Sequence, residues 1–116
     1  MARRDLTGAV DFAYLEGYAA GDQALVDEVL GLFQEQAALW GPMLDPGEPN
    51  WRDAAHTVKG AARGVGAFAL GNACEAAEAG TGSLGAVREA LDAALADIAA
   101  YAHEQMLQSI RSPARD

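Results

Sequence analysis

One of the two histidines, His56, lies in the segment WRDAAHTVKGAARGVG at residues 51–66, whose pattern points to chemistry. At about 3.6 residues per turn, the apolar residues of this segment share one side of a helix and His56 lies opposite them. Lys59 follows the histidine at i+3 and Gly60 follows it at i+4, so both lie near it on the exposed face. This arrangement favours phosphoryl transfer, because a neutral ring nitrogen can attack phosphorus and cations stabilise the phosphoryl oxygens.

The other residues of this face suggest a surface for partner access and docking. Arg52, Lys59 and Arg63 are three of the eight basic residues of an acidic chain, and they lie within roughly 60° of His56. A glycine inside a helix costs about 1 kcal/mol relative to alanine, so we expect Gly60 to leave a partner room to close over the ring. An ordinary surface histidine would explain neither the glycine nor the basic cluster. The residues assigned to docking and access are Gly60, Arg63, Arg52, Thr57 and Gly64.

The elements that position this segment are expected to be helices. Alanine, the best helix former, inflates the hydrophobic content of 51%, and aromatic residues make up only 7%. Apolar residues recur with helical spacing between turn signals, and no segment alternates over the length of a strand. The pattern predicts an all-α fold, an antiparallel up-and-down four-helix bundle with a short extra N-terminal helix. The expected helices span residues 11–20, 23–44, 51–64 and 68–79, with a last helix from 84 that Ser112-Pro113 closes.

Capping residues mark the ends of these helices. Gly21 is expected to end the first helix, and Asp22 is the expected N-cap of the second. Asn50 is the expected N-cap of the third helix, where Asp53 takes the place of the glutamate of a capping box. Ser83 is the expected N-cap of the last helix.

Composition and charge exclude several classes of function. The chain has 116 residues, which predicts a single domain over 1–116 with its core at about 11–110. It carries 8 basic and 17 acidic residues, a net charge of −9 that disfavours nucleic acids and anionic membranes as partners. One cysteine excludes an internal disulfide. We see no secretory signal and no run of about 18 apolar residues, so we expect a cytoplasmic protein. We also expect a monomer.

The second helix has an unusually wide apolar arc, most of which core packing explains. Leu25, Leu32 and Leu39 recur every seven residues along one edge and either belong to the core or form a docking strip for a helix of a partner protein. Gln36 lies inside the arc and is either a buried amide with its own partners or a polar neighbour of His56.

Three further residues that could do chemistry have simpler explanations. Cys74 lies on an apolar face and is expected to be a small core residue. His103 is expected to lie on the surface. Asp53 and His56 have the i, i+3 spacing of a carboxylate–histidine metal motif, but the second such motif that a di-metal bundle requires is missing. On the fourth helix, Glu75 and Glu78 are expected to face water.

The segment AHTVKGAARGVGAFALGNACEAAE at residues 55–78 resembles the histidine-containing phosphotransfer (HPt) domain of two-component phosphorelays. It has the family's His-x-x-Lys-Gly core, followed by small residues. Residues 15–36 also resemble the first long helix of the family, and the similarity spans about residues 11–110. The later positions that match the family pattern are Gly66, Leu70, Cys74 and Glu78.

The resemblance implies specific roles. His56 would accept the phosphoryl group through its distal ring nitrogen, Lys59 would contact the phosphoryl oxygens, and Gly60 would give access. Receiver domains of a hybrid histidine kinase and of a response regulator would be the partners, and they would supply the aspartate and the Mg²⁺. The chain would need no cofactor or metal of its own, and it has no Gly-rich phosphate loop or kinase ATP motif. It would be a stoichiometric phosphoryl carrier rather than an enzyme with turnover.

Two alternatives stay open at this point. The chain could be a non-catalytic helical adaptor that binds a partner through the same face, or an HPt-like fragment of a larger kinase. Met1 and the regular ends favour a complete small protein over a fragment.

Overall fold

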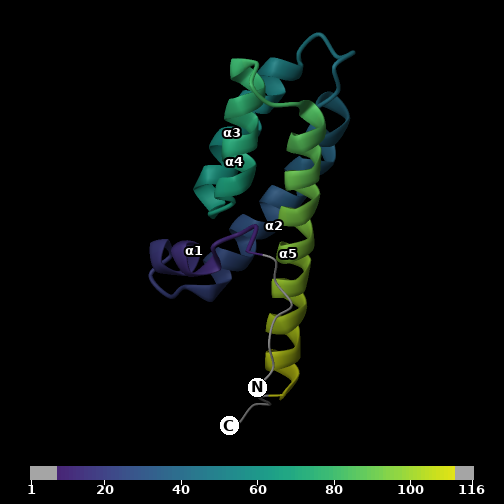
Figure 1. The fold of residues 1–116 in the computed structure, drawn as a ribbon. Helices are drawn as coiled ribbons and strands as arrows, with labels where there is room; N and C mark the ends of the chain where they lie inside the picture. The colour runs from purple at the N-terminus through teal and green to yellow at the C-terminus, as the bar shows by residue number, and fades with distance from the viewer. Residues whose placement is uncertain (1–7, 112–116) are drawn as a thin grey trace.

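The computed structural model describes residues 8–111 of the chain, and all regular structure in this range is helical. α2 to α5 form the four-helix bundle and α1 is the short extra helix, so the predicted fold class is confirmed (Figure 1). The elements are α1 (Phe12–Tyr18), α2 (Gln23–Trp40), the 3₁₀ turn η1 (Gly41–Met43), α3 (Trp51–Val65), α4 (Phe68–Ala79) and α5 (Leu84–Arg111).

The predicted N-caps of α2 and α5 are confirmed. The carboxylate of Asp22 accepts a hydrogen bond from the Leu25 N–H at 3.2 Å, and Ser83 Oγ accepts one from the Ala86 N–H at 3.1 Å. Asn50 is the N-cap residue of α3, as predicted, but the predicted capping box does not form, because the Asn50 side chain makes no capping hydrogen bond. Asn50 has φ −102° and ψ 20°, outside the extended geometry from which an N-cap side chain reaches the first turn.

α2 ends four residues earlier than the periodicity predicts. It stops at Trp40, and Gly41 to Met43 continue as a single 3₁₀ turn. Pro42 cannot donate to the α-helical ladder, so the α-helix gives way to the tighter turn before the predicted break at residue 45. The predicted close of α5 at Ser112-Pro113 lies outside the described residues.

Gly66 is the residue that turns the chain from α3 into α4. Its φ of 90° lies in the left-handed region, and its N–H bonds to the Ala62 carbonyl. A Cβ at this position would come within 2.7 Å of the Asp11 carbonyl oxygen, so α1 can approach α3 only at a glycine. Gly66 therefore fixes both the α3–α4 turn and the position of α1.

The buried side of α3 matches the prediction from spacing. Its buried residues are Ala54, Ala55, Val58, Ala62 and Val65, and Trp51 and Ala61 pack partly covered against them. The three-four spacing of apolar residues on the last helix also predicts that Ala102 shares the buried face, but Ala102 is exposed and Tyr101 is buried in its place.

The reason for this change is that α1 covers the Tyr101 side of α5. Phe12 stacks on the Tyr101 ring with centroids 4.3 Å apart, and the Tyr101 hydroxyl donates to Glu16 Oε2 at 2.6 Å. One turn earlier on α5, the buried Asp97 accepts a hydrogen bond from the Ala9 N–H at 2.8 Å. Apolar and polar contacts together hold α1 against the bundle.

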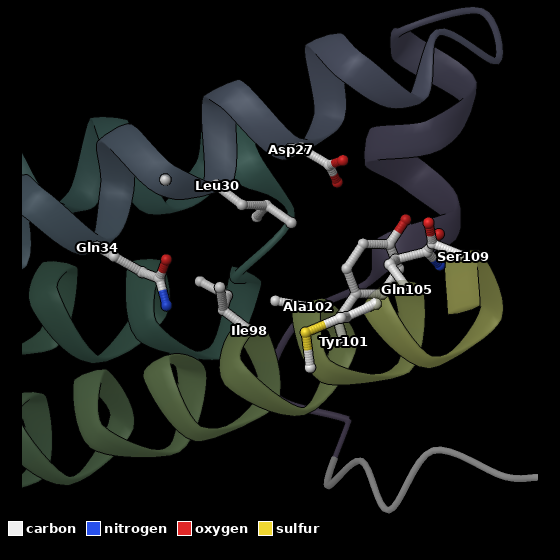
Figure 2. A pocket seen from close by; sticks show the side chains of 10 residues that line it. Asp27, Leu30, Gln34, Ile98, Tyr101, Ala102, Gln105 and Ser109 are labelled. Atoms are coloured by element: carbon white, nitrogen blue, oxygen red, sulfur yellow. The ribbon is translucent and has the colours of Figure 1, made fainter. Parts of the chain in front are cut away.

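Figure 2 shows a groove between α2 and α5, and neither His56 nor any other residue of α3 lines it. Only residues of these two helices line it, among them Leu30, Ile98 and Tyr101. Gly31 also lines it, and a Cβ added there would meet nothing within 4 Å.

Cys74 is a core residue, as predicted, and its thiol is expected to be unreactive in the folded protein. The residue is fully buried, and burial, aided by the nearby Glu78 charge, raises the pKa of the thiol to about 11. Only the thiolate reacts with alkylating agents, so at pH 8 we expect no labelling by iodoacetamide until the protein is unfolded in guanidinium. Labelling of the native protein at the rate of a free cysteine would contradict this packing.

Candidate functional site

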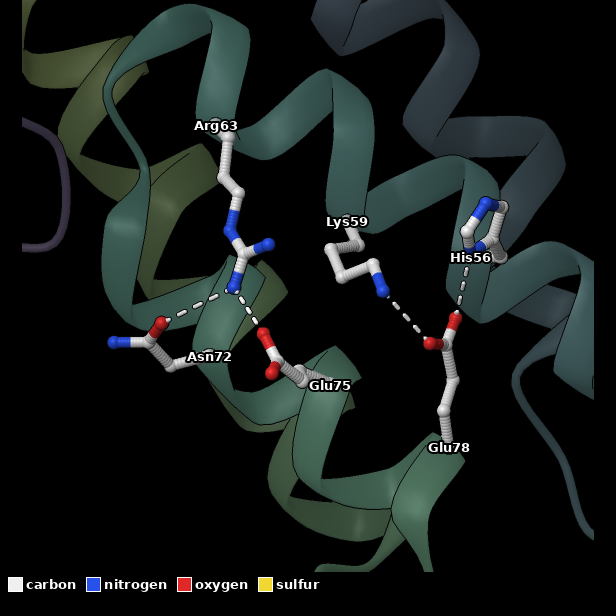
Figure 3. A network of polar contacts seen from close by, with 6 residues as sticks. All are labelled: His56, Lys59, Arg63, Asn72, Glu75 and Glu78. Carbon is white, nitrogen blue, oxygen red and sulfur yellow. Dashed lines mark hydrogen bonds and ion pairs between the residues drawn. The ribbon is translucent and has the colours of Figure 1, made fainter.

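His56 lies on the exposed face of α3, where the spacing predicts it. Its side chain is 73% exposed, and its Nδ1 lies 3.2 Å from Oε2 of Glu78 on α4. Figure 3 shows the second ring nitrogen, Nε2, pointing away from Glu78. One nitrogen of the ring is therefore occupied within the protein and the other is open to an incoming group.

Glu78 links His56 to Lys59. Its second oxygen, Oε1, accepts a hydrogen bond from Lys59 Nζ at 2.9 Å, so one carboxylate holds both functional side chains (Figure 3). The prediction that Glu78 faces water is wrong, since its side chain is only 21% exposed, and that of Lys59 is 18% exposed. Antiparallel packing of α3 on α4 covers both residues and brings them together.

The pKa of Glu78 lies below its usual range, mainly because Lys59 donates a hydrogen bond to the ionised carboxylate. A lowered carboxyl pKa stabilises the fold above the unfolded-state pKa, and this contribution is lost as the pH falls through the folded-state pKa. We therefore expect the wild type to lose stability between about pH 5 and pH 3, and Glu78→Gln to lose less over that range. Urea unfolding at each pH measures the difference, and equal losses in the two proteins would contradict this ion pair.

The two arginines predicted to lie around His56 have contacts of their own in the structure. Arg63 Nη2 lies 2.5 Å from Glu75 Oε1 and 3.4 Å from Asn72 Oδ1, and this contact lowers the pKa of Glu75. The Arg52 guanidinium lies over the ring of Trp51, 4.5 Å from its centroid. Each arginine thus has its own contact, whereas Lys59 shares a carboxylate with His56.

The flank of His56 that faces α2 is open. Gly60 and Gly64 are exposed, and a Cβ added to either would meet nothing within 4 Å. Packing therefore does not require glycine at these positions. Thr57 is exposed on the same flank.

An apolar groove between α2 and α3 borders this open flank. Leu32, Phe33 and Val65 line it, and Gly64 lies at its edge on α3. Gln36 also lines the groove and is exposed, so it is a polar neighbour on the His56 side of the molecule and not a buried amide. The edge leucines of α2 are exposed rather than part of the core: Leu25 by 42%, Leu32 by 52% and Leu39 by 63%.

Other candidate sites add nothing to this surface. His103 is exposed on α5, as predicted. Between residues 8 and 111, no three or more His, Cys, Asp or Glu side chains are placed to hold a metal ion. In the same range, no helix combines the length and the apolar character needed to span a bilayer.

Comparison with known proteins assigns the family. The model of the Hpt domain matches residues 23–112. The chain belongs to the Hpt domain family. This Hpt domain is similar to the crystal structure of the histidine phosphotransferase ShpA from Caulobacter crescentus, with 76% identity and a TM-score of 0.87 over 89% of this chain and 99% of that chain. No curated protein sequence matches the chain. Histidine phosphotransfer in a phosphorelay, the function predicted from the sequence, is the function of this Hpt domain.

The structure brings together only part of the predicted site. His56 and Lys59 meet at Glu78, while Thr57, Gly60 and Gly64 border the open flank. Sequence reasoning placed Glu78 within the family pattern but missed its contact with both side chains. The available signal was its position on α4, 22 residues after His56, on a helix expected to pack against α3.

Proposed function

We propose that this Hpt domain carries a phosphoryl group on Nε2 of His56, between receiver-domain aspartates of a hybrid histidine kinase and a response regulator. The observation that carries the proposal is an exposed imidazole whose Nδ1 is held by Glu78 while Nε2 faces solvent.

The contact with Glu78 determines which ring nitrogen can act as the nucleophile. A glutamate with a lowered pKa is ionised at neutral pH and can only accept hydrogen bonds. The Nδ1 of His56 must then carry the proton, which leaves the lone pair of a neutral ring on Nε2. Glu78 thus acts as a positioning residue that fixes both the tautomer and the direction of the ring.

The transfer step balances without a further reactant. The Nε2 lone pair attacks the phosphorus of an aspartyl phosphate, a new N–P bond forms, and the P–O bond to the aspartate breaks to release its carboxylate. The phosphorylated ring gains positive charge, which the Glu78 carboxylate at Nδ1 stabilises. Reversal of the same step passes the group to the next receiver. The receiver supplies the aspartate and Mg²⁺, and the Hpt domain holds no cofactor of its own.

We propose that the Lys59 ammonium group weakens its hydrogen bond to Glu78 during transfer and contacts the phosphoryl oxygens. A charge-assisted hydrogen bond is worth about 1.5–3 kcal/mol, so we expect Lys59→Ala to slow transfer about 10- to 100-fold. The Lys59–Glu78 pair lies near the surface, so the same variant should lose less than about 1 kcal/mol of stability. Rapid-quench transfer kinetics and urea unfolding measure the two effects. A large loss of stability with unchanged transfer would assign Lys59 a structural role only.

The receiver is proposed to dock on the groove between α2 and α3, across Gly60 and Gly64. The exposed leucines of α2 and the apolar lining of the groove support this choice, because exposed apolar surface of this kind is typical of protein–protein contacts. The net charge of −9 supports a protein partner over nucleic acid or an anionic membrane, and we propose a cytoplasmic monomer.

A panel of phosphorylated receiver domains tests the proposal. Receivers from Caulobacter crescentus, the source of the similar ShpA, are suitable probes. We expect at least one of them to transfer a label to the Hpt domain that is labile in acid and stable in alkali. Binding of a receiver without any transfer of label would instead favour a non-catalytic adaptor.

A further inference from the structure

Glu78 contacts a different side chain with each of its two carboxylate oxygens. Oε2 lies 3.2 Å from Nδ1 of His56, and Oε1 accepts the hydrogen bond from Lys59 Nζ at 2.9 Å (Figure 3). The side chains of Glu78 and Lys59 are mostly covered, whereas that of His56 is exposed. Partial shielding from water strengthens the effect of a charge on its neighbours, so the carboxylate acts on the imidazole more strongly than a fully exposed one would.

Phosphorylation changes the charges around this carboxylate. When Nε2 of a neutral ring bonds to phosphorus, Nδ1 still carries its proton and the ring becomes a cation. In the resting protein the pKa of Glu78 is lowered mainly by Lys59 and less by His56, while burial acts in the opposite direction. Once Lys59 turns to the phosphoryl oxygens, the cationic ring is the remaining partner of Glu78. The carboxylate therefore holds the Nδ1 proton most strongly in the phosphorylated state.

The Nδ1 proton determines how the phosphoryl group can leave the ring again. In the outgoing step a carboxylate oxygen of the receiver attacks phosphorus, the P–Nε2 bond breaks, and its electron pair returns to Nε2. If Nδ1 carries a proton, the ring leaves as neutral imidazole and no proton has to move. If Nδ1 has lost its proton, the ring must leave as an imidazolate anion, which is a far poorer leaving group.

The other ionisable groups beside this site have different positions or stay uncharged. Those of α3 and α4 are Arg52, Asp53, Arg63, Cys74 and Glu75. Arg63 pairs with Glu75, and the Arg52 guanidinium lies over the Trp51 ring. Asp53 lines a groove toward α2, and the side chains that α2 contributes to the grooves beside α3 are uncharged. The Cys74 thiol stays uncharged because its pKa is raised to about 11. Glu78 is the carboxylate in contact with the ring.

We propose that Glu78 keeps the proton on Nδ1 of His56 in both transfer steps, so that the ring attacks and leaves as the same neutral imidazole. This inference rests on the proposed phosphotransfer at His56. It gives Glu78 a role in the outgoing step, which selection of the tautomer before the attack does not require. Glu78 acts through the ring and not on the phosphoryl group, so it remains a positioning residue. The Hpt domain then passes the group on without taking up or releasing a proton.

Outgoing transfer from the phosphorylated Hpt domain to an unphosphorylated receiver, measured between pH 6.5 and pH 8, tests the inference. An imidazole that no carboxylate holds loses its proton at about pH 6.5, and contact with an opposite charge moves this loss upward by about one to three pH units. We therefore expect the wild-type rate to fall about twofold or less over this range, and the Glu78→Gln rate to fall about 15-fold. The ratio of the two rates at each pH removes the pH dependence of the receiver itself.

Glu75→Gln is the matched control for this experiment. Glu75 is a carboxylate one turn earlier on α4, but it pairs with Arg63 and not with His56. Its replacement should leave the pH profile of the wild type unchanged. ¹⁵N NMR of the phosphorylated wild type is a second measurement that needs no variant, and we expect Nδ1 to keep its proton up to about pH 8.

Each result either supports or overturns the inference. A Glu78→Gln rate that is unchanged, or that is lowered equally at every pH, would overturn it while leaving phosphotransfer through His56 intact. The same holds if Glu75→Gln has the profile of Glu78→Gln, or if Nδ1 of the phosphorylated wild type loses its proton near pH 6.5. A wild type that accepts no label from any receiver would instead refute the proposed function.

Discussion

A His56→Gln protein is expected to accept no phosphoryl group from any receiver that labels the wild type. Glutamine keeps a polar side chain of similar reach but offers no nucleophilic nitrogen, so the N–P bond cannot form. Because His56 is exposed and outside the core, the variant should fold with nearly the same stability as the wild type. Incubation with a radiolabelled receiver, followed by gel electrophoresis, measures the label on each protein.

His103→Gln is the matched control for this experiment. His103 is the second of the two histidines in the chain and is also exposed, but it lies on α5. Its replacement should leave transfer unchanged. Label on the folded His56→Gln protein, or loss of label in the His103→Gln protein, would show that another residue accepts the group.

Gly60→Gln is expected to reduce transfer at least about 100-fold while making the protein slightly more stable. Gly60 lies one turn after His56 on the flank that the receiver must cover, and a long side chain there would obstruct the approach to Nε2. The fold itself accepts a larger residue, since a Cβ at position 60 meets nothing within 4 Å. Replacing a helical glycine by glutamine should add about 0.5 kcal/mol or more to the free energy of unfolding.

Gly31→Gln is the matched control for Gly60→Gln. It distinguishes steric obstruction of the receiver from the change in helix stability that replacing a glycine causes. Gly31 is also a glycine inside a helix with open space at its Cβ position, but it lies in the groove between α2 and α5, which no residue of α3 lines. This variant should gain similar stability and transfer at the wild-type rate. Transfer kinetics and urea unfolding of both variants test this assignment. If the Gly60→Gln protein transfers at the wild-type rate, Gly60 is not needed for access of the receiver.

The spacing of apolar residues was enough to predict the side of α3 on which His56 lies. A helix of fixed period converts sequence position into direction, so Val58 and Ala62 had to face the core once His56 was placed outside. The glycines at positions 64 and 66 predict a break between the third and fourth helices, but only the structure adds that the Asp11 carbonyl requires a glycine at position 66.

The contacts of the long side chains could not be predicted in this way. A helical wheel gives the direction of a Cβ atom, whereas the tips of Lys59 and Arg63 turn toward carboxylates on a different helix. Glu78 is 19 residues from Lys59, and their contact depends on the register of α3 against α4. For this reason the spacing did not predict the contact of Arg63 with Glu75, and the bridging role of Glu78 was missed.

The predictions that failed at helix ends have a local cause. A cap depends on backbone angles that residue types do not fix, and Asn50 adopts angles that keep its side chain from the first turn of α3. α2 ends before Pro42 although the apolar period continues to Leu44, because a proline interrupts the hydrogen-bond ladder whatever the pattern around it.

Locating the phosphoryl group on the labelled wild-type protein tests the central claim most directly. Tandem mass spectrometry of phosphorylated peptides identifies the residue, and ³¹P NMR distinguishes the two nitrogens of a phosphorylated imidazole. We expect one phosphoryl group per chain, on Nε2 of His56, because Glu78 holds Nδ1. A phosphoryl group on Nδ1 of His56, on His103 or on a carboxylate would contradict the proposed mechanism.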